Sequence, residues 1–152
     1  MARPGKEGAL PTNPRLGDYP ALTARRTAIG SSRLAFVLTA STPQKYPHGQ
    51  SRIVYVGTTP DGARGLAQGI AKHADAILGL HGVRSFEARI VTCHSRQNVK
   101  TWLKLEKALL MAFRREFGAV PLCNSKGRKA KPGDEASYFR RDRVEAIIRE
   151  LS

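Results

Sequence analysis

The chain has 152 residues, of which 41% are hydrophobic, and its 26 Lys and Arg outnumber 12 Asp and Glu to give a formal net charge of +14. This length suits one compact domain with tails, and no run of about 18 apolar residues is present, so we expect no membrane span. The charge favours a polyanionic partner such as DNA or RNA, although a ribosome-associated or membrane-surface protein would share it.

We expect the first 31 residues to form a flexible basic arm ahead of one folded domain at 32–152. The arm contains several prolines and glycines with scattered arginines, and no strand or helix periodicity persists in it. It also lacks the apolar core of a signal peptide, so we expect a cytoplasmic protein. The two cysteines, Cys93 and Cys123, form no CxxC pair, and their spacing with His94 fits no standard zinc pattern.

Two strands joined by a loop are predicted at the start of the domain. The apolar run 34–38 is typical of a buried strand, and the segment 52–57 is rich in β-branched residues. The segment 42–50 between them contains two prolines and a glycine, so we expect a loop there. Together these segments predict an antiparallel hairpin.

A helix and a third strand follow the hairpin. Thr59 or Asp61 is expected to cap the helix, and Gly79 and Gly82 to stop it. Residues 86–92 alternate between apolar and polar side chains, which indicates a strand. The apolar residues that recur at helical spacing are Leu66, Ile70, Ala74 and Ile77.

The strongest helical pattern covers about 96–117 and ends at Gly118, with a basic loop after it at 119–133. A final amphipathic helix is predicted at about 137–151. The order β-β-α-β-α-α favours a small α+β domain in which helices flank an antiparallel three-stranded sheet. The apolar stripe of the long helix consists of Val99, Trp102, Leu103, Leu110, Phe113 and Phe117. The final helix is expected to turn toward the core Phe139, Val144, Ile147, Ile148 and Leu151.

Glu106 is the residue that least fits its surroundings. It lies three residues after Leu103 and four before Leu110, a spacing that places its carboxylate within the apolar stripe. A carboxylate facing a core is unfavourable unless it is paired or bound to a cation. Two interpretations stay open: Glu106 pairs with a lysine or arginine at the edge of the stripe, or it holds Mg²⁺ together with water and a substrate phosphate.

Four motifs in chain order resemble the GIY-YIG nuclease domain. The tripeptide YVG at 55–57 stands in the place of the second half of the namesake motif, and Arg64 follows on the first helix. The sequence LEK at 105–107 is similar to the helix that bears the family's metal-binding glutamate, and PLCN at 121–124 to the downstream proline and asparagine. The resemblance covers about residues 33–126 and implies a metal-dependent endonuclease that hydrolyses DNA phosphodiester bonds.

The resemblance also implies a role for each of these side chains. Glu106 would hold one divalent ion, Mg²⁺ or Mn²⁺, and Arg64 would contact the scissile phosphate. Tyr55 would orient the attacking water or take its proton, and Asn124 would brace the site by hydrogen bonds. His73 stands for a further polar residue that many members place on the first helix. The basic residues expected to contact the nucleic acid are Lys100, Lys126, Arg128 and Lys129.

The first half of the namesake motif is altered, because LAF at 34–36 stands where the family has Gly-Ile-Tyr. Phe36 lacks the hydroxyl, so either Tyr55 suffices or Tyr46 reaches into the site with His48. The alternative function is therefore a catalytically impaired nucleic-acid-binding module with the same fold, and a basic domain for an acidic protein partner is a third. DNA is the expected partner, while RNA, the substrate form, sequence specificity and the oligomeric state stay open.

Overall fold

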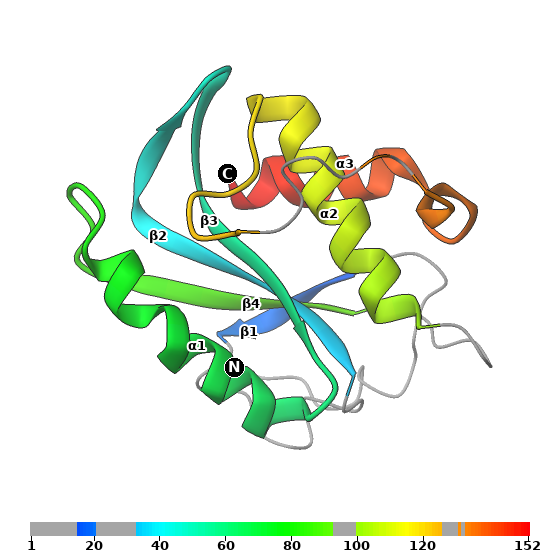
Figure 1. Ribbon diagram of the computed structural model, residues 1–152, viewed down its shortest axis with the longest axis horizontal. Helices are drawn as coiled ribbons and strands as arrows, with labels where there is room; N and C mark the ends of the chain where they lie inside the picture. Colours follow the sequence, from blue (N-terminus) through cyan, green and yellow to red (C-terminus); the bar gives the residue numbers. More distant parts are fainter. Residues whose placement is uncertain (1–14, 21–32, 93–99, 126–130, 132) are drawn as a thin grey trace.

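The computed structural model describes residues 15–20, 33–92, 100–125, 131 and 133–152 of the chain. The predicted α+β class is confirmed, since strands 2 to 4 form an antiparallel sheet that helices flank (Figure 1). The elements in chain order are β1 (Arg15–Pro20), β2 (Leu34–Tyr46), β3 (Gly49–Thr59), α1 (Gly62–Leu78), β4 (Phe86–Thr92), α2 (Thr101–Phe117), the 3₁₀ turn η4 (Glu135–Ser137) and α3 (Arg141–Leu151).

The sheet has the strand order β1-β4-β2-β3, so β2 is central and β3 forms one edge. Val37 of β2 lies opposite Val56 of β3 on one side and Arg89 of β4 on the other. In Figure 1, β3 passes between α1 and α2, and both helices pack against this edge strand.

The hairpin is longer than predicted, and the expectation of a loop over residues 42–50 was wrong for most of that segment. β2 continues through Pro43 to Tyr46, and β3 begins at Gly49. The register shifts between Thr39 and Gln44, an irregularity that accommodates a proline without a ladder hydrogen bond. The Gln44 amide nitrogen donates to the carbonyls of Thr42 and His81, at 3.0 Å each, which fixes the irregular stretch.

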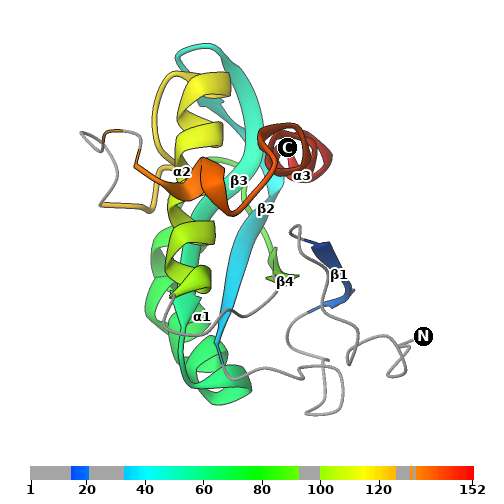
Figure 2. The same ribbon diagram turned by 90° about the vertical axis from the view of Figure 1, so that its right-hand side faces the viewer.

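A fourth strand lies inside the segment that the sequence indicated to be an irregular arm. β1 pairs antiparallel with β4, with Leu16 opposite Val91, and residues 1–14 and 21–32 lie outside the described part of the chain. The six residues of β1 have no alternating apolar pattern of their own, so the pairing comes from the open edge of β4. In Figure 2, β1 stands apart from α1 and α2, with the other strands between.

Each face of the hairpin is covered by different helices, because successive side chains of a strand point to opposite faces. Val37 and Val56 belong to a cluster with α2 and α3, whereas Phe36 and Leu38 belong to a cluster with α1. The buried strand predicted at 34–38 is therefore confirmed, with apolar contacts on both faces. The α1 residues of the second cluster are Leu66, Ile70 and Ile77.

The long helix is turned slightly from its predicted orientation. Leu103, assigned to the apolar stripe, is 40% exposed, whereas Leu105 and Leu109 are fully buried. α2 packs against both the sheet and α3, so its buried arc is wider than the predicted stripe and is centred nearer Leu105 and Leu109. Gly118 ends the helix as predicted, in a left-handed conformation with φ of 81°. The predicted core residues Phe139, Val144, Ile147, Ile148 and Leu151 are all buried.

The last helix begins later than predicted, since residues 135–137 form a 3₁₀ turn and α3 starts at Arg141. Across the described ranges, the structure has no helix that is both long and apolar enough to cross a membrane.

Candidate functional site

Glu106 lies on the buried face of α2, as its position in the stripe predicts, and is only 6% exposed. Its carboxylate oxygen Oε2 accepts a long hydrogen bond of 3.4 Å from the Thr58 hydroxyl near the end of β3. A buried carboxylate requires partners or a cation, because removing it from water is unfavourable. The structure therefore buries a carboxyl side chain next to the edge strand of a protein whose net charge is +14.

A bulge in β3 sets the direction of Tyr55. Leu38 pairs with Tyr55 and Thr39 pairs with Ile53, so Val54 is an extra residue in the ladder. Tyr55 is half-buried and packs against the cluster on the α1 side of the sheet. There its ring stacks on the imidazole of His73, with ring centroids 3.9 Å apart and planes 30° from parallel.

Electrostatics link Tyr55 to Glu106. Burial, and then the negative charge of Glu106, raise the pKa of the Tyr55 phenol above its ordinary value. Burial, and then the charge of Lys72, lower the pKa of His73. Both stacked rings are therefore neutral near neutral pH, and Tyr55 is a phenol that can donate or accept a hydrogen bond. A cation near Glu106 would oppose the second of the two effects on Tyr55.

Two glycines leave the space that the aromatic rings fill. A Cβ on Gly57 would lie 2.5 Å from Tyr55 Cε2 and 3.0 Å from both the Tyr55 hydroxyl and Phe36 Cζ. A Cβ on Gly69 of α1 would also lie 3.0 Å from Phe36 Cζ. Phe36 is 2% exposed, so its ring is a packing element beneath Tyr55, 5.9 Å away between centroids. The close packing of Gly69 was not predicted, since an isolated glycine in a helix carries no specific signal.

Hydrogen bonds from Asn124 attach the segment after α2 to the open edge of β3. Its side-chain oxygen accepts from the Val56 N–H and its side-chain nitrogen donates to the Val56 carbonyl, both at 2.9 Å. The backbone N–H of Cys123 adds a bond of 2.9 Å to the Val54 carbonyl. The amide of Asn124 thus replaces a neighbouring strand, because it satisfies the backbone N–H and carbonyl of Val56, which lies between Tyr55 and Gly57.

Arg64 is the predicted site residue that the structure does not connect to the others. It is exposed on the first turn of α1, nine residues before His73, which at 3.6 residues per turn is about half a turn out of phase. Within the described part of the chain, Arg64 takes part in no ion pair and no side-chain hydrogen bond. The structure therefore places Tyr55 against His73 and within electrostatic reach of Glu106, and Asn124 bonds to the adjacent backbone of Val56. It leaves Arg64 on the outer face of α1.

Of the two alternatives for the hydroxyl that Phe36 lacks, the one in which Tyr46 reaches into the site with His48 was wrong. The Tyr46 hydroxyl donates to the Ile53 carbonyl at 2.8 Å and accepts from the Leu122 N–H at 3.0 Å. Its ring packs in the other cluster, edge-on to Phe113 at 4.9 Å. His48 lies in the hairpin turn, next to Gly118.

The basic residues that we expected to contact a nucleic acid are only partly described. Lys126, Arg128 and Lys129 lie outside the described residues, as do Cys93 and His94 of the zinc pattern that we considered. Lys100 is exposed immediately before α2.

An aromatic and cationic pair that sequence reasoning missed lies at the same end of α2. The guanidinium of Arg33 lies over the ring of Trp102, 4.9 Å from its centroid. Trp102 is half-buried and stands one helical turn before Glu106. Sequence reasoning assigned Trp102 to the core and Arg33 to no site, because nothing local joins residues that are far apart in the chain.

The metal that the resemblance implies is a single divalent ion, and Glu106 is the described residue that could hold it. Among the described residues, no group of three or more His, Cys, Asp and Glu side chains is arranged to hold a metal. Mg²⁺ is commonly held by one or two carboxylates, with water and substrate phosphate as the other ligands. Glu106, with the Thr58 hydroxyl beside it, meets that smaller requirement.

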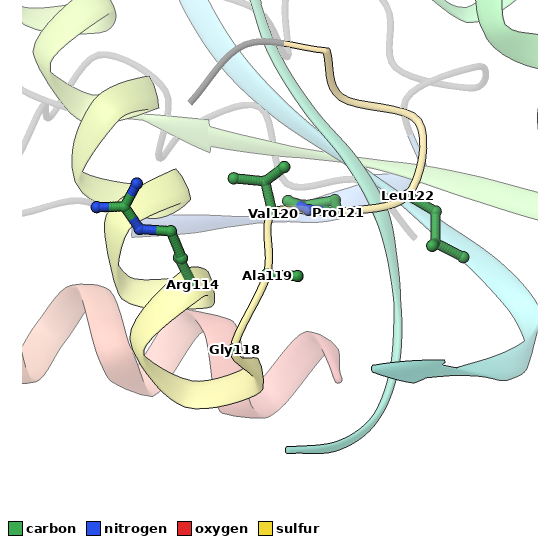
Figure 3. Close-up of a pocket in the computed structure, with 6 residues that line it drawn as sticks. All are labelled: Arg114, Gly118, Ala119, Val120, Pro121 and Leu122. Atoms are coloured by element: carbon green, nitrogen blue, oxygen red, sulfur yellow. The ribbon is translucent and has the colours of Figure 1, made fainter. Parts of the chain in front are cut away.

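A cavity of about 390 Å³ lies at the C-terminal end of α2, away from this cluster (Figure 3). Arg114 is its one charged side chain, and the remaining wall is formed by Gly118, Ala119, Val120, Pro121 and Leu122. None of the residues around Glu106 lines it, so it adds nothing to the site on β3. Comparison with protein-family models, with curated proteins and with solved structures finds no match to this chain.

Proposed function

We propose that the protein is a metal-dependent endonuclease that hydrolyses DNA phosphodiester bonds, with Glu106 as the ligand of one Mg²⁺ or Mn²⁺ ion. The observation that carries the proposal is a carboxylate that is only 6% exposed, that accepts a hydrogen bond from Thr58 and that raises the pKa of Tyr55, in a chain with a net charge of +14. The positive charge would attract a polyanion, and a site of negative charge within it would attract the ion.

The chemistry of the ion is to offset the charge that develops on the phosphate and on the leaving oxygen. Glu106 would hold it at the edge of β3, where the Thr58 hydroxyl donates a hydrogen bond to Oε2 of the carboxylate. A single carboxylate leaves the other coordination positions to water and to the substrate phosphate.

Tyr55 is the residue best placed to orient the attacking water. Its raised pKa keeps the phenol protonated at neutral pH, so it acts first as a hydrogen-bond partner of the water. The stack on His73 restricts the phenol ring to one orientation, and Gly57 leaves room for it. Asn124 is a positioning residue, because its amide fixes the backbone of Val56 next to Tyr55.

A second candidate function is a nucleic-acid-binding module that has lost the chemistry, and Phe36 favours it. The ring that replaces the first motif tyrosine is 2% exposed and carries no hydroxyl, and Tyr46 does not substitute for it. In that case salt-sensitive binding of DNA or RNA would persist without cleavage under any divalent metal.

The test is a cleavage assay on plasmid and oligonucleotide DNA, with Mg²⁺ or Mn²⁺ and with EDTA. Glu106→Gln removes the charge but keeps the shape, and we expect cleavage to fall by about 100-fold or more as charge stabilisation is lost. Glu116→Gln is the matched control, because Glu116 is exposed on the same helix. Binding of the DNA should survive both substitutions.

Two outcomes would count against the nuclease. Cleavage that is equally fast in Glu106→Gln and the wild type would remove Glu106 from the metal site. A wild-type protein that binds DNA without cutting it in either metal would support the binding module instead, and restored cleavage in Phe36→Tyr would then indicate decay from an enzyme.

A further inference from the structure

Arg33 lies at the same end of the hairpin as Glu106. It directly precedes β2, whose first residue, Leu34, pairs with Thr59 of β3. The neighbouring Thr58 donates the hydrogen bond to Glu106. Arg33 therefore precedes the part of β2 that lies one strand spacing from the end of β3, where Thr58 contacts the carboxylate.

Trp102 joins Arg33 to the helix that carries Glu106. Residues four apart on a helix have Cβ atoms about 5–6 Å apart and share a face, which places the indole next to the carboxylate side chain of Glu106. The guanidinium of Arg33 lies 4.9 Å from the centroid of the indole ring. The N–H donors of a guanidinium lie in the plane of the group, so contact of one of its faces with an aromatic ring does not occupy them.

We propose that Arg33, whose guanidinium lies over the ring of Trp102, binds a phosphodiester group of a nucleic-acid strand beside Glu106. This inference rests on the proposed function for its ligand, but it concerns binding and does not require that the strand be cut. A planar fork matches two oxygens of one phosphate, and the contact with the indole reduces the side-chain freedom lost on binding. Arg33 thus takes the phosphate-binding role that the sequence assigned to Arg64, which the structure leaves on the outer face of α1.

The test is the binding of a fluorescently labelled single-stranded oligodeoxynucleotide in EDTA, followed by anisotropy over a range of salt concentrations. We expect Arg33→Ala to raise Kd about 10-fold and to flatten the slope of log K against log salt by about 0.7, the loss of one phosphate contact. Arg84→Ala is the matched control and should change neither quantity. Arg84 is, like Arg33, an exposed arginine, but it lies near Ser41, toward the other end of β2.

A second measurement uses the fact that Trp102 is the only tryptophan of the chain. We expect the unlabelled oligonucleotide to change the intrinsic tryptophan fluorescence of the wild type, and to change that of Arg33→Ala much less. Inorganic phosphate is titrated in parallel. Inorganic phosphate could produce the same fluorescence change and displace the oligonucleotide at a concentration equal to that of the oligonucleotide's phosphate groups. The site would then bind free phosphate, and the proposal would be wrong.

The outcomes separate this inference from the proposed function. An Arg33→Ala variant that binds with the wild-type Kd and salt slope overturns the inference even if the wild type cleaves DNA. A weakened Arg33→Ala in a protein that cleaves nothing supports the inference and contradicts the nuclease. Arg33→Lys keeps the charge but not the fork, and should fall between the wild type and Arg33→Ala.

Discussion

Asn124→Ala tests whether the side-chain amide of Asn124 stabilises the open edge of β3. The substitution removes both hydrogen bonds to Val56, each 2.9 Å long, and leaves the Val56 N–H and carbonyl without those partners. Val56 is fully buried and Asn124 is 3% exposed, so water reaches these groups poorly. The backbone next to Tyr55 then loses its support on the open side of the sheet.

The magnitude follows from the two lost bonds. A typical intramolecular hydrogen bond contributes about 1 kcal/mol net, and a buried group left unsatisfied costs about 1–3 kcal/mol. Two such groups with partial relaxation give a loss of about 2–4 kcal/mol in the free energy of unfolding. For a chain of this length 1 kcal/mol corresponds to about 2–4 °C in Tm, so we expect Tm to fall by about 5–15 °C.

The assay is thermal and urea unfolding of Asn124→Ala beside Ser125→Ala, an exposed neighbour that serves as the control. Asn124→Asp refines the comparison, because a carboxylate still accepts from the Val56 N–H but cannot donate to the Val56 carbonyl. A Tm of Asn124→Ala within about 1 °C of that of Ser125→Ala would refute the argument that this amide replaces a strand.

The remaining predictions concern the aromatic residues of β2 and β3. Burial raises the pKa of Tyr46 to about 12, so the folded state holds that proton more tightly, and its contribution to stability is lost as pH rises from about 10 to 12. The stability advantage of the wild type over Tyr46→Phe, about 1–3 kcal/mol near neutral pH from the two hydroxyl hydrogen bonds, should narrow across that window in urea titrations. Glu106→Gln should lower the pKa of Tyr55, since it removes one cause of the raised value. An ultraviolet titration of the phenols, with Tyr55→Phe as reference, measures this pKa, and an unchanged or higher value in Glu106→Gln would contradict the prediction. Gly57→Ala should displace the Tyr55 ring from its stack and destabilise the fold by about 1–3 kcal/mol, whereas an unchanged Tm and an unchanged Tyr55 titration would contradict the 2.5 Å approach.

Local signals were sufficient for the elements that depend on local physics. The strand at Phe86–Thr92 and the helix ends at Leu78 and Phe117 agree with the alternation and the glycines that predicted them. The strand at Arg15–Pro20 was missed because its order comes from pairing with β4, and its own six residues show no alternation. The extension of the hairpin through Pro43 was missed for a related reason, since the bonds that hold it come from Gln44 to the distant carbonyl of His81.

In the candidate site, too, the features that depend on one element could be predicted, and those that depend on contacts between distant segments could not. The burial of Glu106 could be predicted, because it follows from helical spacing within one element. The stack of Tyr55 on His73 could not, because it depends on the bulge at Val54 and on how α1 lies against the sheet. The pairing of Arg33 with Trp102 also joins segments that only the fold brings together.

The place of Arg64, however, could have been predicted from the sequence. Leu66, Ile70 and Ile77 are buried and share one face of α1, and His73 lies seven residues after Leu66, so it falls on that face. Arg64 lies two residues before Leu66, about 200° around the helix, and so points outward. A motif match supplies an ordered set of residue types, whereas helical phase decides which of them can face one site. Applied to this helix, phase favours His73 over Arg64. A phosphate-binding cation beside Glu106 would then have to come from another element, which is the role that we propose for Arg33.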